Sequence, residues 1–152
     1  MNTNTKAIYF DMDGTIADLY GVSGWLDDLR SFKVRPYLEA AALINLNQLA
    51  RKLNYLQKKK GYVIGVVSWS SKESTIEYDR EITVAKIRWL VSHMPSVNWD
   101  EIHIVPYGTP KEEVVKCPMG ILFDDTIEVR EKWKGTAFDV NEILEILRGL
   151  EG

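Results

Sequence analysis

The segment from Lys6 to Thr15, KAIYFDMDGT, constrains the fold of this chain more than any other. Its apolar run 7–10 has the length and composition of a buried strand, so Asp11 and Asp13 stand where that strand ends. Two carboxylates this close repel each other and raise each other's pKa unless a cation or a hydrogen-bond donor compensates. Magnesium suits such a pair because it prefers hard oxygen ligands. Gly14 then lets the chain turn sharply out of the strand.

A D-x-D-G sequence also occurs in solvated Asp-Gly turns, and an isolated motif of this kind is more often such a turn than a site. A calcium-binding helix-loop-helix loop is excluded, because it needs glycine at its sixth position and glutamate at its twelfth. Here the glycine is the fourth residue and Val22 is the twelfth. The rest of the chain therefore decides between a turn and a magnesium site.

Further apolar runs predict four more strands, at residues 62–67, 102–105, 121–123 and 136–138. Helical segments are predicted between them at 73–93, 111–117 and 127–134, and a terminal helix at 141–150. Strands that are continuously apolar and separated by helices indicate a parallel sheet covered on both faces. The predicted fold class is therefore α/β, with a three-layer, Rossmann-like arrangement.

Two helices carry specific expectations about their buried sides. A single helix is predicted from Pro36 to Lys60, with an apolar stripe at Leu38, Ala42, Leu46, Leu49, Leu53 and Leu56. Its terminal lysines, 58–60, complement the helix dipole and need no ligand to explain them. The helix at 73–93 is expected to bury Ile76, Ile87, Leu90, Val91 and Met94. Residues 16–34, by contrast, have no sustained periodicity and are predicted to form a flap over the aspartates. Within it, Trp25 could touch substrate, although packing under its own loop is the more common role of such a residue.

Length and composition predict one domain spanning residues 1–152. The chain has 45% hydrophobic residues, which is sufficient for one sizeable core. Its net charge is -3 with dispersed basic residues, which argues against a dedicated duplex nucleic-acid surface but not against a small phosphorylated ligand. The oligomeric state is left open.

Cysteine usage and hydropathy bear on the compartment. Cys117 is the single cysteine, which excludes an internal disulfide and fits a reducing environment. No apolar run has transmembrane length, and the N-terminus lacks the hydrophobic segment of a signal peptide. We therefore expect a cytoplasmic protein without a membrane partner.

Three of the predicted strands end in polar or acidic side chains. These are Asp11 with Asp13, Ser68, and the pair Asp124 and Asp125. Taken singly, Ser68 and the Asp124–Asp125 pair could each cap the following helix. Because ligands bind beyond the carboxyl ends of the strands in an open parallel sheet, the three sets together predict one site.

Four carboxylates in one pocket need a divalent cation and a lysine to compensate their charge. Lys111, in the loop between the third and fourth strands, is best placed to supply it. Lys116 is the second candidate, and Lys86, in the middle of a helix, is a distant third. Trp69 follows Ser68 and is expected either to stack on a base or to pack against the adjoining helix, which is at least as common.

With these residues, the chain resembles the haloacid dehalogenase-like (HAD) superfamily of phosphohydrolases. The four signatures of that superfamily correspond here to DMDGT at 11–15, an apolar strand ending in Ser68, Lys111, and an apolar strand ending in Asp124-Asp125. They occur in the right order over nearly the whole chain, and the first is specific.

The resemblance implies a magnesium-dependent phosphomonoesterase. Asp11 would attack phosphorus and form an aspartyl-phosphate, and Asp13 would protonate the leaving oxygen and then activate water. Ser68 would bind a phosphoryl oxygen, with Gly14 and Thr15 of the first motif beside the substrate, and Lys111 would steady the nucleophile and the phosphate. Magnesium would be bound by the Asp11 carboxylate, the Asp13 main-chain carbonyl and one acid of the pair Asp124 and Asp125.

The resemblance also bears on the substrate. Many members of the superfamily carry a separate cap domain, for which this chain has no room. The segments VVSWSS, KIRWL at 86–90 and FDDTIEVREKW are similar in layout to 5'-deoxyribonucleotidases and to the capless phosphatase domain of polynucleotide kinase-phosphatase. Nucleotide or polynucleotide phosphate ends are therefore the expected substrates, although the helical insertion that forms the base pocket of the deoxyribonucleotidases is missing.

Three alternatives stay open at this point. One is a phosphatase of another small phosphorylated metabolite, and another is a catalytically inactive protein that binds phosphate for regulation. The third is a phospho-accepting receiver domain, which also combines acids, a hydroxyl, a lysine and magnesium on a parallel sheet. In receivers, however, the acid pair ends the first strand and the accepting aspartate ends a middle one, which is the reverse of the order here.

Overall fold

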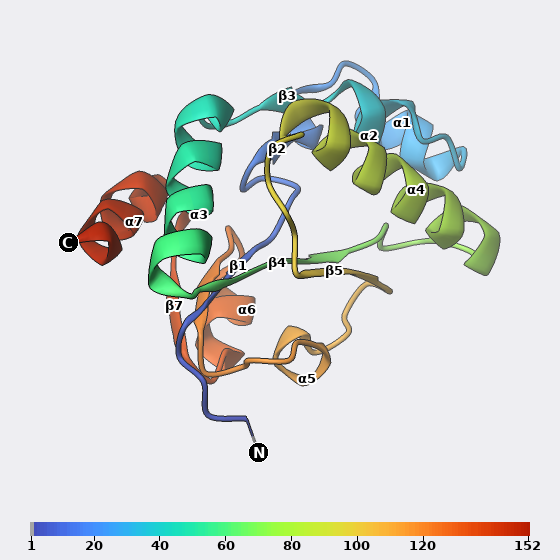
Figure 1. The fold of residues 1–152 in the computed structure, drawn as a ribbon. Coiled ribbons are helices and arrows are strands. Elements are labelled where there is room, and N and C mark those ends of the chain that lie inside the picture. Colours follow the sequence, from blue (N-terminus) through green and yellow to red (C-terminus); the bar gives the residue numbers. More distant parts are fainter. Residues whose placement is uncertain (1) are drawn as a thin grey trace.

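Five parallel strands form the centre of the computed structural model, which describes residues 2–152 (Figure 1). They lie in the order β5-β4-β1-β6-β7, which is third, second, first, fourth and fifth along the chain. This is the strand order of a Rossmann-like sheet. The strands are β1 (Ala7–Phe10), β4 (Val63–Trp69), β5 (Glu101–Val105), β6 (Ile121–Phe123) and β7 (Thr136–Phe138). The predicted α/β class with a parallel sheet is confirmed.

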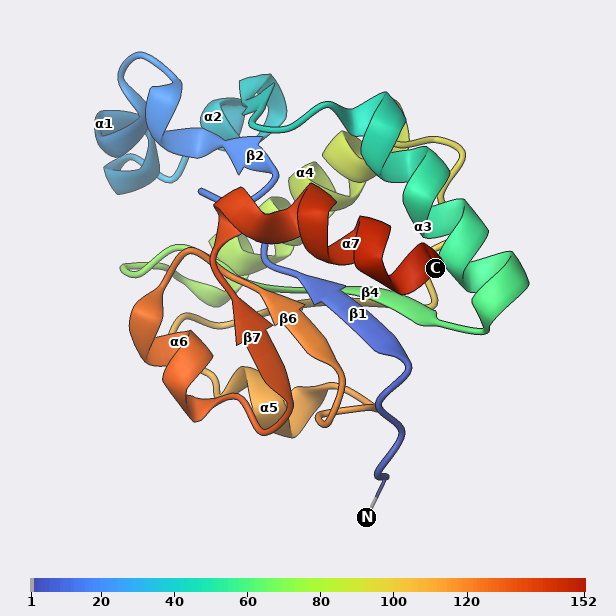
Figure 2. The same ribbon diagram turned by 90° about the vertical axis from the view of Figure 1, so that its left-hand side faces the viewer.

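Helices flank the sheet on both faces. The helices α3 (Leu46–Lys60), α4 (Ile76–His93) and α7 (Ile143–Glu151) lie on one face, and α5 (Lys111–Val114) and α6 (Ile127–Lys132) on the other (Figures 1 and 2). A short 3-10 helix, η2 (Val140–Glu142), leads into α7. Side chains alternate between the two faces along a strand. Ile8 and Phe10 therefore pack in the larger core cluster with α3 and α7, and Tyr9 packs in the smaller one with Val129 and Trp133.

The segment predicted as a flap contains regular structure. It comprises β2 (Ala17–Asp18), the 3-10 helix η1 (Leu19–Gly21) and α1 (Trp25–Arg30), and it is followed by α2 (Arg35–Glu39). We use the name flap for η1, α1 and α2 together. These elements pack against the first half of α4 through a separate apolar cluster made of Leu19, Leu29, Tyr37, Tyr78, Ile82 and Ala85.

The prediction of one helix from Pro36 to Lys60 is wrong. The chain leaves α2 after Glu39, and β3 (Ala41–Ala42) pairs antiparallel with β2. A new helix, α3, starts at Leu46 because Asn45 caps it, its Oδ1 accepting the Gln48 N–H at 3.1 Å. The first two members of the predicted stripe, Leu38 and Ala42, are consequently exposed, whereas Leu49, Leu53 and Leu56 are buried as expected.

The predicted buried side of α4 is wrong for three of its five residues. Leu90 and Met94 are buried, but Ile76 and Val91 are 69% and 64% exposed and Ile87 is exposed as well. The buried side is formed instead by Tyr78, Ile82, Ala85, Lys86, Trp89 and Leu90. The helix packs against the flap at one end and the sheet at the other, so its buried face is set by two different partners.

The other elements match closely. The observed bounds of β1, β6 and β7 are those predicted. The strand predicted at 62–67 begins one residue later and ends two residues later, so that β4 includes Ser68, and the helix predicted at 111–117 ends at Val114. Among the described residues, no helix combines the length and apolarity that crossing a bilayer requires.

Candidate functional site

The candidate site lies at the carboxyl ends of β1 and β6. The chain runs from β1 outward to β4 and β5 on one side and then returns to β6 on the other side of β1. This reversal leaves a crevice between β1 and β6, and crevices of this kind hold the ligands of open α/β sheets. Asp11 directly follows β1 and donates its backbone N–H to Phe123 O of β6 at 3.0 Å. Asp124 directly follows β6.

Lys111 joins the two strand ends. Its Nζ lies 3.1 Å from Asp11 Oδ1 and 2.6 Å from Asp124 Oδ2, and both ion pairs are buried. The short helix α5 begins at this lysine, on the face of the sheet opposite α4. The second oxygen of Asp11, Oδ2, accepts the Thr15 hydroxyl at 3.1 Å. The nucleophile predicted at Asp11 is therefore fixed at both oxygens.

Asp125 completes an acidic cluster with Asp11 and Asp124. One carboxylate oxygen from each of the three lies within 4.8 Å of the others. Thr126 N–H donates to Asp124 Oδ1 at 2.9 Å, which orients that carboxylate. Gly14, with a φ of 81°, lies directly beside Asp125, and a Cβ there would collide with the Asp125 carboxylate. The cluster offers the hard oxygen donors that magnesium prefers.

The charges of this cluster are only partly compensated. Burial, followed by the charge of Asp11, raises the pKa of Asp124 to about 6 and that of Asp125 to about 7. Burial alone would raise the pKa of Asp11 too, but the charges of Lys111 and Lys86 outweigh it and lower that pKa. One ammonium group in contact cannot neutralise three carboxylates, so a divalent cation fits the charge as well as the donor set.

The Asp13 side chain is not part of this acidic cluster but contacts Lys86. Lys86 Nζ lies 2.8 Å from Asp13 Oδ2, 2.7 Å from Ser68 Oγ and 2.7 Å from Trp69 O. Burial raises the pKa of Asp13, with the Lys86 charge acting against it. The two aspartates of the DMD sequence still repel each other, since the charge of Asp11 adds to the raised pKa of Asp13, but each is paired with its own lysine.

The structure corrects the predicted order of the three candidate lysines, in which Lys86 stands last. Its side chain is only 1% exposed, and its Nζ lies 5.3 Å from the centre of the Tyr37 ring. The second candidate, Lys116, is exposed and uses its backbone N–H, not its side chain, to contact Glu101. A signal for Lys86 is present in the sequence, because it stands four residues from both Ile82 and Leu90 and thus shares their buried face.

Ser68 and Trp69 lie at the end of β4, beside the two lysines. The Ser68 hydroxyl is buried and accepts from Lys86. Trp69 donates its Nε1–H to Thr109 O at 2.8 Å. The centre of its ring lies 5.1 Å from Lys111 Nζ and 4.7 Å from the centre of the Tyr107 ring. The Trp69 side chain thus packs within the site, against the loop that contains Tyr107 and Thr109, and against the smaller core cluster.

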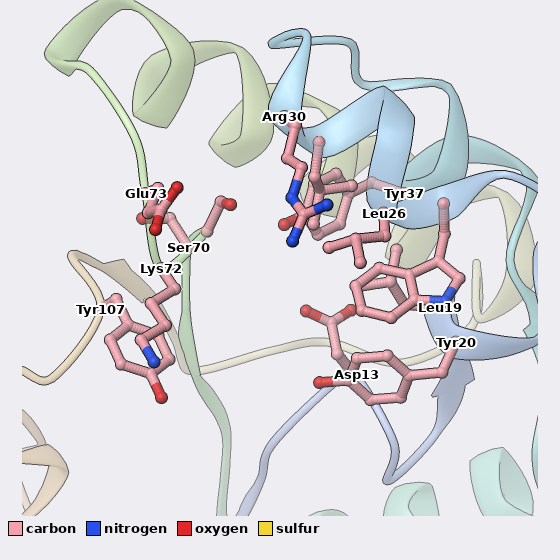
Figure 3. A pocket seen from close by; sticks show the side chains of 13 residues that line it. Asp13, Leu19, Tyr20, Leu26, Arg30, Tyr37, Ser70, Lys72, Glu73 and Tyr107 are labelled. Atoms are coloured by element: carbon pink, nitrogen blue, oxygen red, sulfur yellow. The ribbon is translucent and has the colours of Figure 1, made fainter.

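Two adjoining hollows open at the site. The smaller, about 130 Å³, is lined by Asp11, Lys111, Asp125, Thr126 and Trp69. The larger, about 260 Å³, lies between the flap and the loops that follow β4 and β5 (Figure 3). Four residues line both: Asp13, Tyr20, Ser70 and Tyr107. The last three were not predicted as site residues: Tyr20 and Tyr107 lie in segments without a motif, and within VVSWSS only Ser68 and Trp69 were singled out.

The amino-acid sequence matches no protein-family model, and its comparison with curated proteins found no significant similarity.

Proposed function

We propose that this protein is a magnesium-dependent phosphomonoesterase of the HAD-like type that works through an aspartyl-phosphate. The observation that carries the proposal is the division of the two aspartates between two lysines. Lys111 contacts both Asp11 and Asp124, two members of the acidic cluster that could bind a metal ion. Lys86 contacts Asp13, whose side chain is not part of that cluster. An anionic nucleophile and a neighbouring proton carrier with oppositely shifted pKa values are what a two-step phosphoryl transfer needs.

In the first step, one Asp11 carboxylate oxygen attacks phosphorus in line with the ester oxygen. The Asp11–phosphorus bond forms as the bond from phosphorus to the ester oxygen breaks, and the leaving oxygen takes a proton from Asp13. Lys111, in contact with Asp11, offsets the negative charge that two anions bring together.

In the second step, Asp13 takes a proton from a water molecule, whose oxygen attacks the phosphorus of the aspartyl-phosphate. The Asp11–phosphorus bond breaks, releasing inorganic phosphate and restoring both carboxyl groups. Lys86 contacts Asp13 and Ser68 at once, so it fixes the position of the proton carrier relative to the end of β4.

Asp11, Asp124 and Asp125 are the side chains that would hold magnesium, with the Asp13 main-chain carbonyl as a further ligand in the HAD-like assignment. When bound, the ion supplies charge neutralisation and orientation of the phosphate.

The strand order favours this proposal over a receiver domain. Receiver-type folds have the order second, first, third, fourth and fifth, which places the first strand beside the third. Here β1, the first strand of the sheet along the chain, lies between β4 and β6, which are the second and the fourth.

Nucleotides or polynucleotide phosphate ends are the proposed substrate class, and another small phosphorylated metabolite is the alternative. The test is hydrolysis of p-nitrophenyl phosphate with and without magnesium. Asp11→Asn should abolish metal-dependent turnover, and the exposed Asp27→Asn serves as a matched control that should retain it. Equal background rates in wild type and Asp11→Asn would reject the enzyme and favour a phosphate-binding regulatory protein.

A further inference from the structure

We propose that the larger hollow, beneath the flap, binds a flat aromatic ring of the leaving group, so that the substrate is a nucleoside monophosphate. The inference rests on the proposed function for the direction of the substrate and on the walls of the hollow for its chemistry. The hollow has a volume of about 260 Å³, and Figure 3 shows Asp13 between its two walls.

The position of Asp13 determines which part of the substrate enters the hollow. Asp13 protonates the leaving oxygen, so the leaving group must be in contact with it. Asp13 lines both hollows, whereas Asp11, Lys111 and Asp125 line only the smaller one. A phosphoryl group held by Asp11 and Lys111 thus directs its ester oxygen, and the group attached to that oxygen, toward the larger hollow.

The walls of this hollow are aromatic and apolar. On the flap side, Tyr20 and Trp25 pack edge to face with their ring centres 5.0 Å apart, and Leu26 lies beside them. Tyr107 stands on the opposite wall. Tyr20 and Tyr107 are 51% and 49% exposed, so both retain ring surface that a bound base can cover. Stacking on such rings is the usual means by which proteins hold bases without reading their sequence.

Polar groups occur at the rim. Arg30 comes from the flap, and Lys72 and Glu73 from the loop after β4 (Figure 3). Within residues 2–152, none of these three side chains has a hydrogen-bond or ion-pair partner that fixes it, so they are available to the edge of a base.

Size limits the occupant further. Ligand pockets are typically about 300–1,000 Å³, and this hollow of about 260 Å³ lies just below that range, so its occupant must be small, such as one base with its sugar. Further nucleotides of an oligonucleotide would lie outside it. Trp69, the aromatic residue first considered for stacking, lines only the smaller hollow, where Lys111 and Tyr107 flank its ring.

The test compares two esters of the same primary alcohol, thymidine 5'-monophosphate and 2-deoxyribose 5-phosphate, which differ in the base. With magnesium, kcat/KM should be at least about tenfold higher for the nucleotide, as expected for one stacked base. Trp25→Ala and Tyr107→Ala, one from each wall, should each lower that ratio at least about threefold. Tyr55→Ala removes an exposed tyrosine on α3 that lines neither hollow, and it should leave the ratio unchanged.

A kcat/KM ratio near one in the wild type would refute the proposed base pocket without contradicting the proposed phosphatase activity. The same conclusion would follow if Trp25→Ala and Tyr107→Ala lowered kcat/KM equally for both esters. If neither ester is hydrolysed, the proposed function fails, and calorimetry of the nucleotide with Asp11→Asn decides the pocket separately. Binding that weakens in the Asp11→Asn/Trp25→Ala protein supports the pocket, and absence of binding rejects it. Comparing a 5'-phosphorylated oligonucleotide with the mononucleotide then distinguishes chain ends from free nucleotides as the source of the same terminal group.

Discussion

Replacing Lys86 by methionine isolates the charge that holds Asp13. Methionine keeps most of the unbranched stem of lysine but removes the ammonium group and its three contacts, with Asp13, Ser68 and Trp69 O. Removing one partner of a buried ion pair destabilises a protein by about 3–5 kcal/mol, because the other charge stays buried without compensation. The Asp13 side chain is 15% exposed and can take up a proton, so we expect the lower limit, about 3 kcal/mol near pH 7.

Urea unfolding measures this loss. With a urea dependence of about 2 kcal/mol/M, a loss of about 3 kcal/mol lowers the midpoint by roughly 1.5 M. The double variant Lys86→Met/Asp13→Asn should recover at least about 1 kcal/mol, because it carries no unpaired carboxylate. Lys52→Met, which removes a partly exposed pair with Glu151 at 3.4 Å, should cost less than about 1 kcal/mol and is the matched control.

The pH dependence gives a second check. Burial raises the pKa of Asp13, and removing the opposing charge of Lys86 should raise it further. An acid whose folded pKa is raised adds stability below its unfolded pKa and loses it as the pH rises through the folded one. The deficit of Lys86→Met should therefore shrink as the pH falls below neutrality. A loss of less than about 1 kcal/mol in Lys86→Met near pH 7 would refute the assigned role of this lysine. So would a loss in Lys86→Met/Asp13→Asn that equals the sum of the losses in the two single variants.

Three further outcomes are expected. The Tyr9 hydroxyl donates to the buried Glu101 at 2.5 Å, so Tyr9→Phe should lower the free energy of unfolding by about 1–3 kcal/mol in urea titrations, and an unchanged midpoint would contradict this. Burial and Asp11 raise the pKa of Asp124 to about 6 and that of Asp125 to about 7. Stability from these groups should fall as the pH rises from about 4 to 7 without metal, and magnesium should raise the melting temperature more near pH 7 than near pH 5; equal shifts at the two values would count against the cluster. Gly14→Ala should weaken magnesium binding in calorimetry, because the added methyl meets the Asp125 carboxylate at a φ of 81°; unaltered affinity would show that this contact is unimportant.

The strands and the acidic site could be predicted because each depends on local sequence. Several features coincide at β1, where a short apolar run, two acids and a glycine stand in order. Once the sheet is parallel, the carboxyl ends of its strands must lie at one edge, so Asp11 and Asp124 come together without any detail of packing.

The break between α2 and α3 could not be predicted in the same way. Ala40, Ala41 and Ala42 are good helix formers, and an apolar stripe runs across them. The antiparallel pairing of residues 41–42 with β2 outweighs that helical propensity. This pairing depends on the position of β2 in the folded chain, which local sequence does not determine. Only Asn45, a strong capping residue, marked the true start of α3.

The pairing of Lys86 with Asp13 explains how the site tolerates its own acids. Asp11, Asp13, Asp124 and Asp125 carry up to four negative charges, against which the sequence alone predicts one lysine. With a lysine on each face of the sheet, Asp11 becomes easier to ionise and Asp13 still holds its proton more tightly than usual. Asp124 shares Lys111 with Asp11, so within residues 2–152 the acid left without a lysine contact is Asp125. Under the proposed function, a cation would bind at the cluster of Asp11, Asp124 and Asp125, apart from Asp13 and the leaving group.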